Sequence, residues 1–154
     1  MSVMDHNNIF MKFKDIEVGR DLGTSVVYVT RSAILDYVQA VEDFDPIYME
    51  KEEAQRSGYD SIVAPAGFTI QYTAMKWATG QEKYIPQGSV HIRQVHRTFG
   101  IIKEGDCLRT NVSVGDKYEK KGKYYLEHKI DITNQNNVLV CSSRFITLLP
   151  DTVQ

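Results

Sequence analysis

The chain has 154 residues, of which 42% are hydrophobic and 25% charged, and its formal net charge is −2. This length suits one domain, and the composition excludes disordered and low-complexity architectures. The charge lacks the basic excess of a nucleic-acid binder, and no apolar run approaches the roughly 20 residues of a membrane span. We therefore expect a single domain over residues 1–154 that contacts neither nucleic acid nor membrane.

The first part of the chain predicts a strand followed by a helix. Residues 24–30 are rich in β-branched side chains, which favour a strand. Thr30 fits the N-cap of a helix over residues 31–43, where apolar residues recur at i, i+4 and i+7 and so share one buried face. Asp45-Pro46 should stop this helix, because a residue before proline avoids the helical region.

Two more helices are predicted before the chain changes character. Residues 50–57 predict a short helix, because three glutamates suit its N-terminus, Arg56 suits its last turn, and Gly58 suits the left-handed position after it. Residues 65–79 are apolar nearly all round, with Pro65 fitting the first helical position and Gly80 the residue after the last. Because a helix without a polar face is a buried one, we expect residues 65–79 to be the central helix.

The second half predicts strands separated by turn-like sequences. The strands are expected over residues 90–99, 108–114, 124–133 and 138–149. In the third of them apolar and polar residues alternate, as in a half-buried antiparallel strand. The predicted class is α+β, with an antiparallel sheet that curls around the central helix.

Two stretches carry the candidate site: Asp43-Phe44-Asp45-Pro46-Ile47-Tyr48, and the turn Pro65-Ala66-Gly67. Here the sequence resembles the MaoC-like dehydratases, also called R-specific enoyl-thioester hydratases. Their signature is Gly-Asp-x-Asn-Pro-x-His, followed by an alanine and a glycine-bearing turn into the central helix. The resemblance extends across nearly the whole chain and is closest to the N-terminal-type domain of that family. It implies a single hotdog fold, a curved antiparallel sheet wrapped around the helix over about residues 65–79.

The resemblance also implies roles for particular residues. Asp43 matches the catalytic aspartate, Asp45 replaces the asparagine, and Pro46 matches the proline. Tyr48 stands where the family has its catalytic histidine, and Glu42 replaces the glycine before the aspartate.

The implied substrate-binding residues lie mainly at the start of the central helix. Pro65-Ala66 stands in place of the usual His-Gly, so the backbone amides of Ala66 and Gly67 are the candidates for holding an oxyanion. Asp45 and His91 complete the set, since a histidine often begins this strand in the family.

The implied activity is that of an acyl-thioester hydro-lyase. It would reversibly dehydrate a 3-hydroxyacyl-CoA or 3-hydroxyacyl-carrier-protein to the 2-enoyl thioester. Such a reaction needs a group that removes the α proton, a second that protonates the leaving hydroxyl, and donors for an enolate-like oxygen. A tyrosine with a pKa near ~10 stays protonated at neutral pH, so Asp43 would be the base and Tyr48 the acid or a water-orienting group.

Other interpretations stay open. The chain could be a non-catalytic acyl-binding hotdog that pairs with a catalytic MaoC-like partner. A third interpretation is a hotdog thioesterase. Some of these enzymes place a carboxylate within the central helix, and the absence of one from residues 66–79 counts against this interpretation. Asp43 and Asp45 could also serve only to shape a turn. A lone hotdog leaves a sheet edge open, so we expect a homodimer, a higher homo-oligomer, or a heterodimer with a second MaoC-like chain.

The cysteines and the N-terminal segment fit a cytoplasmic protein. Cys107 and Cys141 have no neighbouring cysteine and read as two reduced, half-buried thiols. The N-terminal residues mix charged and apolar side chains and lack the apolar region of a signal peptide.

The remaining histidines and lysines are expected to be structural. His91 and His96 would point to opposite faces of a regular strand, so they do not suggest a metal site, and we expect no metal and no other cofactor. His128 reads as a satisfied core histidine. Four lysines form a solvated run, in which binding of coenzyme A phosphates or of an acidic carrier protein is only weakly indicated: Lys117, Lys120, Lys121 and Lys123.

Overall fold

The computed structural model describes residues 12–73, 86 and 88–153 of the chain. Its helices and strands, with 3-10 helices labelled η, follow in chain order: η1 (Phe13–Asp15), β1 (Asp21–Tyr28), α1 (Arg31–Val41), η2 (Pro46–Tyr48), α2 (Lys51–Arg56), η3 (Phe68–Thr73), β2 (Val90–Thr98), β3 (Cys107–Lys120), β4 (Lys123–Thr133), β5 (Leu139–Leu148) and η5 (Asp151–Val153).

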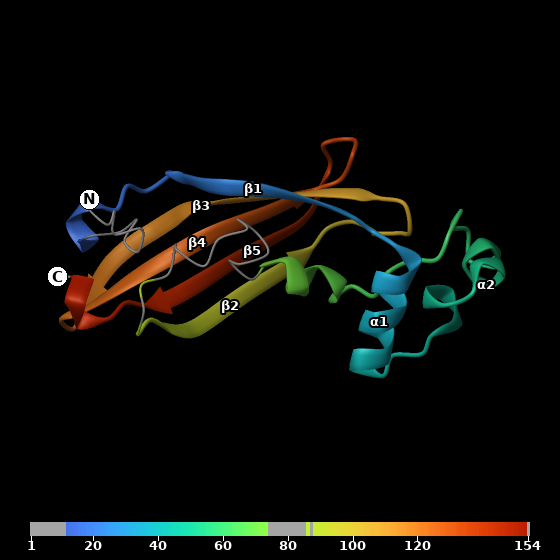
Figure 1. Ribbon diagram of the computed structural model, residues 1–154, viewed down its shortest axis with the longest axis horizontal. Coiled ribbons are helices and arrows are strands. Elements are labelled where there is room, and N and C mark those ends of the chain that lie inside the picture. The colour runs from blue at the N-terminus through green and yellow to red at the C-terminus, as the bar shows by residue number, and fades with distance from the viewer. Residues whose placement is uncertain (1–11, 74–85, 87, 154) are drawn as a thin grey trace, which may run out of the picture.

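The strands form one five-stranded antiparallel sheet in the order β1-β3-β4-β5-β2, so β1 and β2 are its edges. The helices α1 and α2 lie together beyond one end of the sheet, and η1 and η5 lie at the other end (Figure 1). The predicted α+β class is confirmed. No helix in the described part of the chain is long and apolar enough to cross a membrane.

One face of the sheet is buried, as the alternation in β4 predicts. Leu126, His128, Ile130 and Ile132 are all fully buried, and the residues between them are partly exposed. The buried side chains form two clusters. The first includes Ile16, next to η1, and the second gathers beneath α1 and η3. The candidate site borders the second cluster.

The boundaries of several elements differ from the prediction. Helix α1 ends at Val41, before Asp45-Pro46, because Glu42 adopts a left-handed conformation with φ of 56°. Pro46 is instead the first residue of η2. Strand β3 continues to Lys120, and only Lys121-Gly122 turns the chain, with φ values of 52° and 70° that suit a two-residue hairpin.

The central helix also begins differently. Its described part is the 3-10 helix η3, which starts at Phe68 rather than at Pro65, because the amides of Phe68 and Ile70 bond three residues back, to Pro65 and Gly67. Residues 74–79 of the predicted helix lie outside the described residues. Pro65-Ala66-Gly67 therefore forms a turn ahead of the helix.

A β-bulge in β2 overturns the expectation for its histidines. His91 pairs with Thr147 and Arg93 with Ile146, so Ile92 is an extra residue without a partner on β5. Because residues paired across a sheet share a face, His91 and His96 both lie on the inner face, with the buried Thr147 and Ser143. A regular strand would have placed them on opposite faces.

Candidate active site

Helix α1 presents Tyr37 to the start of η3. The Thr30 hydroxyl caps the helix by accepting a hydrogen bond from the amide of Ala33 at 3.2 Å, as predicted. Burial of Ile34 and Val38 fixes which side of the helix faces the core. Tyr37, on the edge of that side, packs edge-on against Phe68, with ring centroids 5.7 Å apart.

The loop after α1 places Asp43 and Tyr48. The left-handed Glu42 turns the chain away from the helix, and Asp43 follows as an exposed side chain. Asp45 accepts a hydrogen bond from the Ile47 amide at 3.1 Å, so it caps η2. This cap orients the short helix that carries the half-buried Tyr48.

The turn Pro65-Ala66-Gly67 is held from two sides. The preceding Ala64 amide donates to the carbonyl of Ile102 at 2.7 Å, and the Thr98 hydroxyl donates to the carbonyl of Ala66 at 3.1 Å. The amides of Ala66 and Gly67 donate to no backbone carbonyl among the described residues. They remain available as donors to a ligand.

The Tyr37 hydroxyl lies against this turn. A Cβ atom added at Gly67 would be 2.5 Å from the Tyr37 oxygen, so the glycine is required for this close approach. Tyr37 therefore links the helix α1 to the turn. The sequence interpretation missed this residue, although a polar-tipped aromatic beside the apolar stripe of a helix was a usable signal.

Two phenols and one carboxylate share this region. Burial, and then the negative charges of Asp43 and Asp45, raise the pKa of Tyr48 above its ordinary value. Burial and then Asp43 raise the pKa of Tyr37. Both phenols therefore stay protonated at neutral pH and are hydrogen-bond donors.

The structure thus groups some predicted site residues and separates others. Asp43 lies in the exposed loop between α1, which carries Tyr37, and η2, which carries Tyr48, and both tyrosines pack against the second core cluster. The Tyr37 hydroxyl lies against the turn that contains the buried Pro65. His91 is not part of this group. It stacks on Phe145, with ring centroids 4.0 Å apart, and Phe145 packs against the first core cluster.

His96 is the histidine of β2 that lies beside the second core cluster. Its Nε2 is 3.0 Å from the Thr69 hydroxyl of η3 and 3.4 Å from the sulfur of Cys141. Burial lowers the pKa of His96 and raises that of the Cys141 thiol, so both are neutral at pH 7. Neither cysteine forms a disulfide in the described part of the chain. Cys107 is half-buried, as predicted, whereas Cys141 is fully buried, because it lies within the second core cluster.

Two further expectations need correction. His128 is buried but not satisfied, since neither ring nitrogen has a hydrogen-bond partner within the described chain, and burial lowers its pKa to about 4. The lysine run is solvated only in part. Lys117 donates to the carbonyls of Phe13 and Lys14, and Lys123 pairs with Asp151.

Comparisons with known proteins place the chain among hotdog dehydratases. Residues 17–143 match the family described as "FAS1-like, dehydratase domain region". The chain is 29% identical over 133 residues to a UPF0336 protein of Saccharopolyspora erythraea, covering 82% of this chain and 85% of that relative.

Solved structures with the same fold include two hydratases or dehydratases. The R-hydratase PhaJ1 of Pseudomonas aeruginosa superposes with a TM-score of 0.74 at 15% identity, over 91% of this chain and 86% of that one. The truncated HadBC complex of Mycobacterium tuberculosis, a 3R-hydroxyacyl-ACP dehydratase, gives a TM-score of 0.66 at 20% identity, over 85% of this chain and 99% of that one. These similarities confirm the predicted hotdog fold.

Proposed function

The chain belongs to the family of FAS1-like dehydratase domain regions, and from this we propose that it catalyses the reversible dehydration of a 3-hydroxyacyl thioester to the 2-enoyl thioester. One observation carries the proposal: the Tyr37 hydroxyl lies against the turn Pro65-Ala66-Gly67, whose Ala66 and Gly67 amides have no described backbone acceptor, and Tyr37 and Tyr48 pack against the same core cluster. In this proposal Asp43 is the base, Tyr48 the acid and the turn the oxyanion site.

In the dehydration direction Asp43 takes the proton from C2, and the electron pair of that C–H bond forms the C2–C3 double bond. The C3–O bond breaks as Tyr48 gives its proton to the leaving hydroxyl, which departs as water. Asp43 is then neutral and Tyr48 a phenolate, and transfer of the proton from the former to the latter restores both. Burial raises the pKa of Tyr48, and the charge of Asp43 raises it further at the start, so loss of that charge would make the phenol a better acid when the proton is needed.

The turn would stabilise the negative charge that develops on the thioester oxygen. The amides of Ala66 and Gly67 have no other described backbone acceptor, and donors of this kind typically contribute about 10²–10³ in rate. The Tyr37 hydroxyl lies beside them as a third donor. This arrangement supplies the enolate-like transition state with hydrogen bonds that are already in place.

The test is hydration of short- and medium-chain 2-enoyl-CoA by the purified chain, measured as the loss of enoyl-thioester absorbance. Asp43→Asn should lower kcat by about 10²–10⁴-fold, because it removes the base. The control Asp36→Asn removes an exposed carboxylate of helix α1 and should leave kcat unchanged. Hydration undiminished in Asp43→Asn would reject these roles. Tyr48→His should raise activity, since imidazole exchanges protons near neutral pH.

A second candidate function has support of its own: this hotdog would bind the acyl chain and pair with a catalytic hotdog. Tyr48 occupies the histidine position, and HadBC, which shares the fold, is a complex. The edge strand β2 exposes Val90 and Ile92, at 53% and 48%, and so offers an apolar edge to a second chain. Light scattering should find a dimer, or a monomer that dimerises only with a hotdog carrying both Asp and His. Turnover that appears only in that mixture would select this function over the first.

A further inference from the structure

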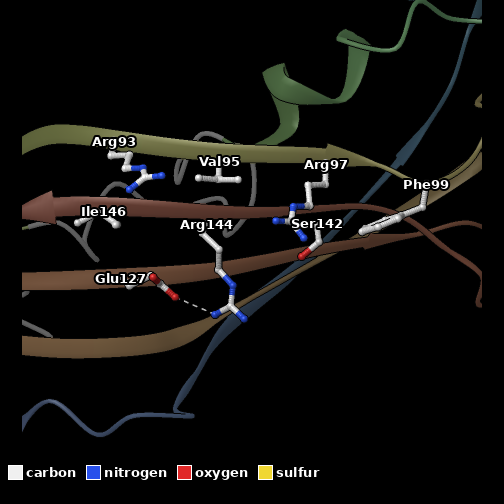
Figure 2. A pocket seen from close by; sticks show the side chains of 8 residues that line it. All are labelled: Arg93, Val95, Arg97, Phe99, Glu127, Ser142, Arg144 and Ile146. Carbon is white, nitrogen blue, oxygen red and sulfur yellow. Dashed lines mark hydrogen bonds and ion pairs between the residues drawn. The ribbon is translucent and has the colours of Figure 1, made fainter.

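The outer face of the sheet carries a groove that the proposed reaction does not use. It has a volume of about 430 Å³ and lies over β2, β5 and β4 (Figure 2). The bulge at Ile92 determines which residues of β2 line the groove, because it sets which of the residues after it face the outer side of the sheet. Its lining consists of Arg93, Val95, Arg97, Phe99, Glu127, Ser142, Arg144 and Ile146.

The lining is rich in positive charge. It contains the guanidinium groups of Arg93, Arg97 and Arg144, and one carboxylate, that of Glu127. Arg144 Nη1 donates to Glu127 Oε1 at 2.8 Å (Figure 2). The groove therefore keeps an excess of positive charge after this pair is counted.

A glycine of β3 leaves room for that ion pair. A Cβ atom added at Gly115 would lie 2.8 Å from Arg144 Nη1 and 2.9 Å from Glu127 Oε1. Gly115 also lies at a bulge, since the register between β3 and β4 shifts between Val114 and Asp116. Arg144 is thus held in a fixed position across the sheet, which lowers the entropy cost of using it to bind an anion.

The remaining walls favour an aromatic ring. Val95 and Ile146 are apolar, and Phe99 exposes 58% of its surface at the end of the groove. Guanidinium groups bind phosphates through paired hydrogen bonds, and an exposed aromatic ring stacks on a nucleic-acid base. A phosphorylated nucleoside has both features.

The groove lies on the opposite face of β2 from the turn Pro65-Ala66-Gly67 of the candidate active site. Arg97 and Thr98 are neighbours in β2, so they face opposite sides of the sheet. Thr98 pairs with the buried Cys141, and its hydroxyl donates to Ala66, in the turn with the available amides. Among the described residues, the end of β2, an edge strand, lies between Arg97 in the groove and that turn.

We propose that this groove binds the 3′-phosphoadenosine diphosphate end of coenzyme A, while the pantetheine arm passes around the end of β2 to Ala66. This inference rests on the proposed function and specifies its substrate as a CoA thioester. The phosphates would bind Arg93, Arg97 and Arg144, and the adenine would stack on Phe99.

Binding of coenzyme A to the full chain, measured by calorimetry, tests the site directly. Arg97→Gln and Arg93→Gln should each weaken binding about tenfold, which corresponds to the loss of one charge-assisted interaction. Adenosine 3′,5′-bisphosphate should bind with the same dependence on these arginines. The matched controls Lys120→Gln and Lys121→Gln remove charges from the exposed hairpin and should change nothing. Equal affinity in the arginine variants, or equal weakening in the lysine controls, would overturn the proposal.

Kinetics with two substrates separates this site from the reaction itself. Arg97→Gln should raise KM for a 2-enoyl-CoA without changing kcat, and should not affect the matching 2-enoyl-pantetheine, which has no nucleotide. Arginine-dependent binding of coenzyme A without any hydration would keep the nucleotide site and reject the proposed reaction. Hydration of both substrates without arginine dependence would support the proposed reaction and reject the nucleotide site. Arginine variants that weaken only a carrier-protein substrate would assign the groove to an acidic protein and overturn the nucleotide site.

Discussion

The sheet and the helical segment over residues 31–67 differ in how they use polar groups and backbone conformation. In the sheet, paired strands satisfy the backbone, and side chains alternate between a buried and a half-exposed face. In the helical segment the chain leaves α1 through a left-handed Glu42, exposes Asp43, and reaches a turn with available amides. Stability is concentrated in the regular region, and the groups able to do chemistry lie where regular structure stops.

His128 is an exception inside the sheet and gives the largest expected effect. Its pKa of about 4 lies below the unfolded value, so the unfolded chain binds the additional proton and stability is lost as pH falls through this interval. Between about pH 7.5 and about pH 4.5 this group should cost about 2.5 kcal/mol of unfolding free energy. His128→Leu should remove that part of the loss, as measured by urea unfolding at several pH values.

Leu126 offers the control, because Leu126→Met changes the same buried face of β4 without removing a titratable group and should leave the pH dependence of stability unchanged. Parallel curves for the parent and His128→Leu would contradict the assignment. They would mean that other groups cause the loss of stability in acid.

Gly67 tests the helical segment with a smaller effect. Gly67→Ala puts a methyl group where the Tyr37 hydroxyl lies, so the tyrosine must move, at a cost of about 1–3 kcal/mol. Hydration activity should fall as well. Adding Tyr37→Phe should recover most of the stability, since the next atom of the ring lies at an ordinary 3.7 Å, but not the activity. Unfolding and kinetic assays of the three variants check this, and full recovery of activity would show that the hydroxyl has no role.

Substitutions at Glu42 and Lys121 allow the two regions to be compared, because both residues have a similar left-handed backbone conformation. Both have positive φ, 56° and 52°, and glycine relieves such strain by about 1 kcal/mol. Glu42→Gly and Lys121→Gly should therefore raise the denaturation midpoint by similar amounts. Only Glu42→Gly should also change kcat, because Asp43 follows it directly. A change in kcat for Lys121→Gly would mean that the two regions are coupled.

Periodicity predicted β3, β4 and β5 because each of these strands buries side chains on one face of the sheet. The alternation in β4 and the N-cap at Thr30 depend on local side-chain chemistry, which is visible in the sequence. The end of α1 was placed too late, since the signal at Pro46 is strong and a left-handed glutamate gives none. Tertiary contacts decide where a helix ends, and the pattern of residues along the sequence does not contain those contacts.

The candidate site was predictable only in part for the same reason. The motif around Asp43 and Tyr48 marks a loop, and the structure places both residues in the segment between α1 and α2, with Tyr48 packed against the second core cluster. Tyr37 comes from a helix that the motif does not include. The contact of Tyr37 with Gly67 depends on how α1 packs on η3, which no local pattern specifies.

The single unpaired residue in β2 also affects how relatives should be compared. If Ile92 were removed and the start of β2 kept its pairing, every later residue of the strand would face the other side of the sheet. The arginines would then point toward the core and His96 toward water. An alignment that slides a gap across this position would equate side chains from opposite faces. Homologues should therefore be aligned on strand pairing here, and lineages with and without this insertion are expected to keep different basic and histidine positions.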